Sequence, residues 1–185
     1  SWSWQGYEGE KAVVEVYANS ASVRLLLNGK EIANKPVKKY KTLFKLPYQP
    51  GTLTAEALDE RGNVISSHSL TTAGEETVLR VTPDKMVLCA NNQSLCYLPI
   101  EFTDKAGNLK PYMEQLVEVA VAGAATLAGF GSALCKTNEV FDKPYHHSYR
   151  GRCLAVLRAG STPGKAKVTV TSAGMEPVTI EVEVQ

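Results

Sequence analysis

The sequence lacks the features that mark several large classes of protein. It contains no run of eighteen apolar residues and no segment that resembles a signal peptide, so it predicts neither a membrane-spanning helix nor a leader. The net charge is +1, and neither half of the chain has the basic excess that binding to a phosphate backbone needs. No pair of cysteines has the C-x-x-C spacing of a zinc site. We therefore expect a soluble chain that acts without a cofactor, a membrane or a nucleic-acid partner.

The sequence does contain a succession of short segments in which apolar and polar residues alternate. Residues 11–33 set the pattern, with apolar side chains at every second position on both sides of the polar break Asn19-Ser20. A period of two is typical of a half-buried β-strand. Asn28-Gly29 then supplies the positive-φ positions of a tight type I′ turn, so this stretch predicts a hairpin. Because a hairpin with one apolar face is barely stable alone, other strands must cover it.

Similar segments follow along the whole chain. Clusters of turn-forming residues separate them at 47–51, 59–63 and 104–108. In the last two clusters an aspartate can bond the turn backbone, and Gly-Asn forms the tip. No helical period is sustained, and the small polar stretch 71–75 marks a boundary. The predicted fold class is all-β, with two consecutive immunoglobulin-like antiparallel β-sandwich domains at residues 1–74 and 75–185.

One segment breaks the alternating pattern. Residues 123–149 are too long for a hairpin connection and too rich in glycine and polar groups for core, so an irregular loop is predicted. Long loops on a rigid sheet often carry binding residues. Phe130, Glu139 and Tyr145 are therefore candidate site residues.

No arrangement of reactive residues predicts catalysis or metal binding. His146 and His147 are neighbours, and neighbours on a strand point to opposite faces, so both could bind one metal ion only from a loop. No other ligand is spaced to help, and we therefore expect exposed loop histidines without a metal. Glu139 and Asp142 are not an acid/base pair by spacing alone, because glycoside hydrolysis needs two carboxyl groups held at a fixed separation across a cleft. Ser132 lacks the Gly-x-Ser-x-Gly context of a nucleophile elbow.

Cys89, Cys96, Cys135 and Cys153 allow three full disulfide pairings. Cys89 and Cys96 flank a polar loop and could face each other across a hairpin, which makes them the candidate disulfide. The alternative is that all of them are buried thiols, since free cysteine often behaves as a small apolar residue.

Lysines are concentrated in one part of the first half. The members of this group are Lys35, Lys38, Lys39, Lys41 and Lys45. Lysines on an outer strand commonly prevent edge-to-edge aggregation, and anion binding is the alternative interpretation.

Aromatic residues mark the start of the chain, where Trp2, Trp4 and Tyr7 lie in the stretch SWSWQGYEGE. Trp2 and Trp4 would share a face if this stretch were extended. Flat aromatic faces anchor interfaces between domains, and they also stack on sugar rings. Because the chain starts abruptly here, we expect a piece of a longer protein whose upstream part docks on these aromatics, with sugar stacking as the alternative.

Residues in both halves carry a resemblance to a known family. They are Trp2–Gly9, Val14–Asn19, Val23–Lys30, Pro47–Leu53 and Thr72–Gly74, then Leu98–Asn108, Gly131–Ala133, Asn138–Phe141 and Tyr149–Ala159. In this order they resemble the region that follows the catalytic barrel in bacterial β-galactosidases of glycoside hydrolase family 2, the large multidomain kind common in Bacteroides-type gut bacteria. The second half is similar to the family's terminal immunoglobulin-like domain.

The resemblance implies an accessory role. The acid/base and nucleophile glutamates of the family lie in the barrel, and no position in this sequence matches them. The implied partner is the upstream barrel of the same polypeptide, with carbohydrate as a further candidate ligand, a homo-oligomeric parent enzyme allowed, and export to the periplasm or the medium expected. Two other interpretations stay open: an independent carbohydrate-binding module that uses Trp2, Trp4 and residues 129–149, or an adhesin-like spacer of stacked immunoglobulin domains.

Overall fold

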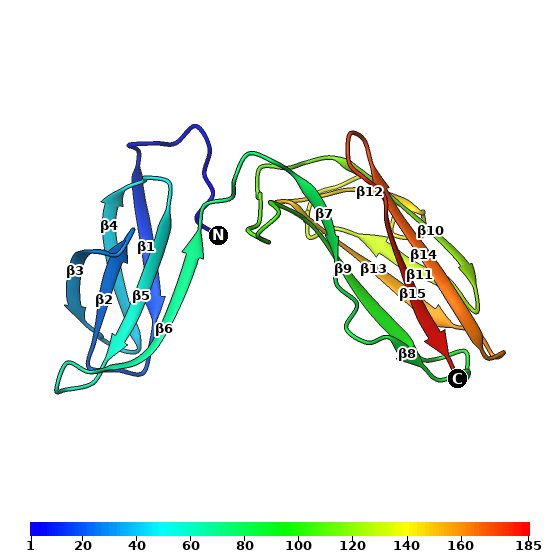
Figure 1. Cartoon of the computed structure of the whole chain (residues 1–185), viewed down its shortest axis with the longest axis horizontal. Helices are drawn as coiled ribbons and strands as arrows, with labels where there is room; N and C mark the ends of the chain where they lie inside the picture. The colour runs from blue at the N-terminus through cyan, green and yellow to red at the C-terminus, as the bar shows by residue number, and fades with distance from the viewer. The chain divides into compact units, whose positions relative to one another are not determined.

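The computed structural model describes all 185 residues, and the chain divides into two compact units. Unit 1 is Ser1–Ala73 and unit 2 is Gly74–Gln185. Every long element in both units is a β-strand, which confirms the all-β prediction (Figure 1). No helix in the structure has the length and the apolar character that a membrane crossing requires.

Unit 1 is a sandwich of two antiparallel sheets. A two-stranded sheet of β1 and β4 faces a four-stranded sheet in the order β3-β2-β5-β6. The strands are β1 (Lys11–Tyr17), β2 (Ser22–Leu27), β3 (Lys30–Pro36), β4 (Lys41–Pro47), β5 (Thr52–Leu58) and β6 (Val64–Thr71). Because β2 lies inside the larger sheet, its alternating side chains Val23, Leu25 and Leu27 are buried.

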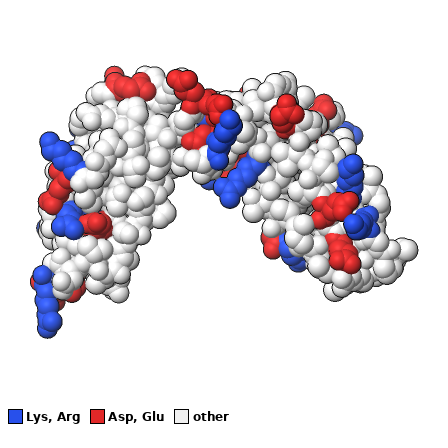
Figure 2. Space-filling view, in the orientation of Figure 1, with Lys and Arg blue, Asp and Glu red and all other residues white.

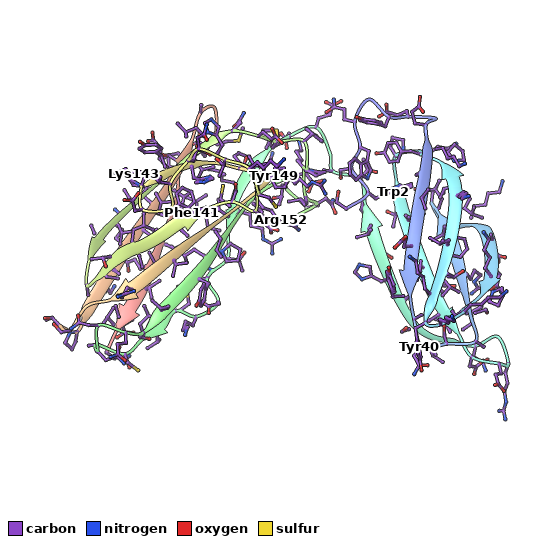
Figure 3. All side chains as sticks on the ribbon, turned by 180° about the vertical axis from the view of Figure 1, so that it is seen from behind. Trp2, Tyr40, Phe141, Lys143, Tyr149 and Arg152 are labelled. Carbon is purple, nitrogen blue, oxygen red and sulfur yellow. The ribbon has the colours of Figure 1, made fainter.

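The hairpin predicted between β2 and β3 is present. Asn28 has a φ of 52° and Gly29 a φ of 77°, the left-handed conformations that a tight turn of this kind needs. The alternation of Tyr40, Thr42, Phe44 and Leu46 in the sequence predicts that Tyr40 faces inward with Thr42, and this prediction is wrong. Tyr40 lies in the turn before β4 with a φ of 62° and is 68% exposed, because the turn ends the alternation (Figure 3).

Unit 2 is a larger sandwich with a five-stranded sheet, β12-β10-β14-β15-β8, and a four-stranded sheet, β11-β13-β9-β7. Its strands are β7 (Val78–Val81), β8 (Val87–Leu88), β9 (Leu95–Thr103), β10 (Leu116–Gly123), β11 (Ala125–Gly131), β12 (Tyr145–His147), β13 (Arg152–Ala159), β14 (Gly164–Ser172) and β15 (Val178–Val184). All pairs are antiparallel except β8 with β15. The core lies between the sheets and includes Leu98, Ile100 and Phe102 of β9.

The prediction of an irregular loop over residues 123–149 is wrong for two parts of it. Ala125–Gly131 is β11, paired with β13, and Tyr145–His147 is β12, paired with β10. A β-bulge between Leu127 and Gly129 shifts the side-chain alternation of β11, and that shift hides the strand from a pattern search. The irregular part is therefore residues 132–144.

The candidate disulfide between Cys89 and Cys96 is not formed. All four cysteines are free thiols. Cys96 points into the core from β9, and its thiol donates to the Lys85 carbonyl oxygen at 3.2 Å, whereas Cys89 is exposed. Cys153 is also buried, so the alternative of buried thiols holds for two of the four.

Candidate docking site

A largely apolar hollow lies on the outer face of unit 2. It is a pocket of about 520 Å³ formed by β9, β11, β13 and the 132–144 loop, and we call it the outer pocket. Its lining includes Pro99, Gly131, Ala133, Phe141, Arg152, Leu154 and Val156. Leu154 and Phe141 are exposed although both are large and apolar. An exposed cluster of this kind is typical of a surface that contacts another molecule.

The 132–144 loop folds back along β11 and forms one wall of the outer pocket. The Phe130 backbone N–H donates to the Phe141 carbonyl oxygen at 2.8 Å, as in a strand pair. The Phe141 ring lies directly over Gly131, where an added Cβ would overlap the ring (Figure 3). Glycine at 131 is therefore what allows the aromatic ring to pack against β11 at this position.

Glu139 fastens this loop to β12. Its Oε1 accepts from His147 Nδ1 at 2.7 Å and from the His147 backbone N–H at 3.1 Å. Its Oε2 lies 3.3 Å from His146 Nδ1, which is also 2.9 Å from the His147 carbonyl oxygen. Because both neighbours of this nitrogen are acceptors, we assign the proton of His146 to Nδ1.

The prediction of exposed loop histidines is wrong for His146. Its ring is fully buried, and it stacks on Phe141 with a centroid distance of 5.7 Å and an interplanar angle of 6°. Its Nε2 has no hydrogen-bond partner. His147 is exposed as expected, and no group of three or more His, Cys, Asp or Glu side chains in the chain could hold a metal ion.

The surroundings of Glu139 favour its ionised form, which suits a residue that holds the loop in place. Burial alone would raise the pKa of Glu139, but the hydrogen bonds from the His147 side chain and backbone outweigh it, and with the nearby imidazoles they lower that pKa. Asp142 does not join it, because that carboxylate points to Lys143 at 3.9 Å. Burial and the charge of Glu139 together raise the pKa of Cys153 to about 12, which keeps the thiol protonated.

The outer pocket offers few polar groups to a ligand. Arg152 is the charged residue of its lining, and its Nε donates to Glu101 Oε1 at 2.9 Å, outside the pocket (Figure 3). No carboxylate is among the lining residues. The pocket can therefore bury apolar surface, but it presents no acid/base pair.

The aromatic residues at the start of the chain lie in unit 1 and divide between core and surface. Trp2 is 4% exposed and packs edge-on against Tyr48, with ring centroids 5.0 Å apart. Its Nε1–H donates to the Gln49 carbonyl oxygen at 2.9 Å. The expectation that Trp2 is free to dock is therefore wrong, since the unit's own core uses it. Trp4 is 45% exposed and Tyr7 is also exposed, so these two remain available on the surface.

The candidates in unit 2 divide in the same way. Phe130 is buried in the core rather than exposed in a loop, because it belongs to β11. Tyr145 is exposed on β12, and Glu139 holds the loop. The sequence reasoning missed Phe141 and Leu154. The alternation of β13 could have placed Leu154 outward, but no local signal predicts that Phe141 covers a glycine.

Comparisons with known proteins agree on one family. The domain family described as "Glycoside hydrolase family 2 C-terminal domain 5" matches residues 79–181. A second family, a domain of unknown function called DUF4982, matches residues 9–66. The curated β-galactosidase BoGH2A of Bacteroides ovatus is 30% identical over the whole chain, which spans 22% of that protein.

Solved structures match over the full length as well. A glycosyl hydrolase family 2 member from Bacteroides cellulosilyticus is 29% identical with a TM-score of 0.93, and the match covers all of this chain and 24% of that one. A β-glycosidase from Bacteroides vulgatus, at 23% identity and a TM-score of 0.91, shares the fold over 99% of this chain and 24% of its own. The chain spans about a quarter or less of the length of these relatives. Together these matches show that the chain belongs to glycoside hydrolase family 2 and is similar to the C-terminal region of its members.

Proposed function

We propose that this chain is a non-catalytic accessory region of a family 2 glycoside hydrolase, and that the outer pocket of unit 2 packs against the catalytic barrel of the same polypeptide. The observation that supports this most directly is the exposure of Phe141 and Leu154 around a pocket whose lining is mostly apolar. Exposed apolar clusters of this kind mark protein interfaces.

The length of the relatives supports the choice of partner. The chain spans 22% of the β-galactosidase BoGH2A, so most of such an enzyme lies outside the matched region. A segment of the same polypeptide meets the pocket at a high effective concentration, and a modest apolar surface is then enough for stable packing. We further propose that the parent enzyme acts on β-galactosides, because the curated relative is a β-galactosidase.

The absence of a carboxylate from the outer pocket supports the non-catalytic role. Glycoside hydrolysis needs two carboxyl groups on either side of the scissile bond. Glu139, a carboxylate of the 132–144 loop that forms one wall of the pocket, accepts hydrogen bonds from the His147 side chain and backbone. We expect the purified chain to leave aryl galactosides intact, and turnover that disappears when a carboxylate is replaced would contradict this part of the proposal.

The docking role is tested in the full-length enzyme with a matched pair of variants. Leu154→Arg places a charge in the outer pocket, and Leu116→Arg places one on β10 of the other sheet. The two leucines are nearly equally exposed, Leu154 at 41% and Leu116 at 39%. We expect Leu154→Arg to split the unfolding of the enzyme into separate transitions and to lower its kcat/KM. Leu116→Arg should leave both unchanged. Equal behaviour of the two variants would exclude the outer pocket as the contact surface.

A further inference from the structure

The sandwich of unit 1 is open on one side. Its smaller sheet has two strands and its larger sheet has four, so part of the larger sheet has no strand opposite. The open part is β6. Ser66, His68 and Leu70 pair with inward residues of β5, yet Ser66 and His68 are exposed and Leu70 is only half-buried. Leu53, the partner of Leu70 on β5, is buried in comparison.

The inward face of β1, in the smaller sheet, is also incompletely covered. Its inward residues Ala12, Val14 and Val16 are only half-buried, whereas Phe44 and Leu46 of the neighbouring strand β4 are buried. A groove of about 400 Å³ follows β1 and includes Ala12, Val14, Leu53 and Leu70 in its lining. Apolar surface of both sheets is therefore left uncovered at the same place.

The backbone of β1 has a free edge along this groove. Tyr48 N–H donates to the Glu10 carbonyl oxygen at 2.7 Å, and Ala18 N–H donates to the Tyr40 carbonyl oxygen at 3.0 Å. In an antiparallel pair, successive residues direct their backbone groups alternately to the two sides. The even-numbered residues of β1 therefore bond β4, and the backbone groups of the odd-numbered residues, Val13 and Glu15 among them, face the free edge.

The same alternation defines the free edge of β6. Thr72 N–H donates to the Gly51 carbonyl oxygen at 2.9 Å, which fixes the even-numbered residues as those that bond β5. The backbone groups of Ser67 and Ser69 then point away from the sheet. β6 has no charged residue and no proline, although both are common devices that protect an edge strand.

The opposite side of unit 1 does have such protection. Its edge strand β3 contains Lys30, Glu31, Lys35 and Pro36. Lys35 Nζ also donates to the Leu43 carbonyl oxygen at 2.9 Å, which covers the outer edge of β4. Figure 2 shows charged side chains gathered on the β3 side of unit 1, while the β6 side of the same view is nearly free of them. The contrast indicates that only the β1–β6 side is kept available for pairing.

We propose that the β1–β6 side of unit 1 binds a second copy of this chain. β1 and β6 run in opposite directions (Figure 1). A two-fold axis parallel to the strands therefore places β6 of one copy antiparallel to β1 of the other, and the reverse pair forms at the same time. Each two-stranded sheet then continues into the partner's four-stranded sheet, and all the free edges on this side close together.

The chemistry of the two strands suits this pairing better than a single added strand. A lone extended strand beside β1 would leave the edge of β6 unpaired, whereas a second copy satisfies both edges. The outward face of β1 carries two charged residues, Lys11 and Glu15, whereas β6 has none. The pairing therefore places no two like charges opposite each other. The half-buried Ala12, Val14 and Leu70 become covered in both copies.

The proposal is tested on the 185-residue chain itself by sedimentation velocity and light scattering from about 1 to about 500 μM. We expect a reversible monomer–dimer equilibrium. Val13→Pro and Ser69→Pro each remove one edge donor, and proline is tolerated where an edge N–H faces solvent, so each should raise the dimer Kd by about tenfold or more. The control is Asn34→Pro on β3, whose N–H faces the protected edge because Val37 N–H donates to the Ala21 carbonyl oxygen at 3.1 Å.

Amide hydrogen exchange gives a second readout that does not depend on substitutions. Val13, Glu15, Ser67 and Ser69 should gain protection as the protein concentration rises, and Asn34 should not. A chain that stays monomeric throughout, assemblies that grow without limit, or an equal effect of all three proline variants would each overturn the proposal. If Val13→Pro does not fold, Ser69→Pro and the exchange data decide. The result is independent of the docking role above, since it needs no catalytic barrel.

Discussion

The ring of Phe141 occupies the space that a side chain at residue 131 would fill. This relationship ties a loop residue to a strand glycine, and it shapes the wall of the outer pocket. The absence of a side chain at Gly131 lets the 132–144 loop lie close to β11. The Phe130 backbone N–H donates to the Phe141 carbonyl oxygen at 2.8 Å at the same place.

Gly131→Ala should therefore disturb the loop more than its small size suggests. The added Cβ overlaps the Phe141 ring, so the ring must leave its place on the sheet, at a cost of about 1–3 kcal/mol in the free energy of unfolding. Gly129→Ala is the matched control on the same strand, because its Cβ would meet only the Phe141 carbonyl oxygen at 3.7 Å, an ordinary contact. Urea unfolding measures both, and equal stability of the two variants would contradict the overlap.

Glu139→Gln should loosen the same loop by another route. The substitution removes the charge that accepts from His147 Nδ1 at 2.7 Å and from the His147 backbone N–H at 3.1 Å. Hydrogen bonds to a charged group contribute about 1.5–3 kcal/mol, so the loop amides should exchange faster by about tenfold or more. Asp142→Asn is the control, since that carboxylate makes only a 3.9 Å contact with Lys143. Unchanged exchange in Glu139→Gln would show that the loop is held by Phe141 alone.

Unit 2 should lose stability in acid because of Asp104. Burial would raise the pKa of Asp104, but hydrogen bonds from the Asn108 side chain and from the Gly74 and Asn108 backbones outweigh it and lower the pKa to about 2. A lowered carboxylate pKa stabilises the folded state above the unfolded value of 3.8, and this contribution disappears as the pH falls to about 2. The expected loss is about 2 kcal/mol.

Urea unfolding at several values from about pH 5 to about pH 2 measures this loss. Asp104→Asn should be less stable than the natural chain at the upper end and should show a flatter dependence on pH. Asp59→Asn is the control in unit 1, where the equivalent turn aspartate is only half-buried, whereas Asp104 is buried, so its effect should be smaller. A pH dependence that survives in Asp104→Asn would assign the acid sensitivity to another group.

The cysteines should fall into two reactivity classes. Burial raises the pKa of Cys96 to about 11 and that of Cys153 to about 12, so neither forms thiolate readily. Cys89 and Cys135 are exposed. A thiol reagent at about pH 8 should label Cys89 and Cys135 in the folded chain, and all four thiols after unfolding without reductant. Peptide mapping identifies the sites, and a failure of Cys89 and Cys96 to react after unfolding would indicate the disulfide that the structure lacks.

Much of the fold could be predicted because its signals are local. The alternation of Val23, Leu25 and Leu27 and the Asn28-Gly29 turn determine β2 and the hairpin that follows. The turn aspartates were predictable too, since Asp59 accepts from the Asn63 N–H at 2.8 Å within a few residues.

The rest depends on contacts between residues far apart in the sequence. The sequence predicts that Trp2 docks against another domain, but Trp2 is buried against Tyr48 and bonds the Gln49 carbonyl oxygen, and no residue near Trp2 in the sequence predicts these partners. β11 was missed because its bulge and its small residues hide a strand that β13 stabilises. The sequence predicts an exposed His146, but Phe141 of the preceding loop stacks on its ring.

The two ends of unit 1 are fastened to each other. The Thr72 hydroxyl donates to the Trp2 carbonyl oxygen at 2.6 Å, and the Ala73 N–H donates to Ser3 Oγ at 2.9 Å. A module whose ends meet can be inserted into a host protein, or deleted from it, without forcing the flanking chain to bridge a long gap. Unit 1 can therefore be deleted without leaving a gap in the chain. A shortened protein that joins the residue before Trp2 directly to Gly74 should still allow unit 2 to fold.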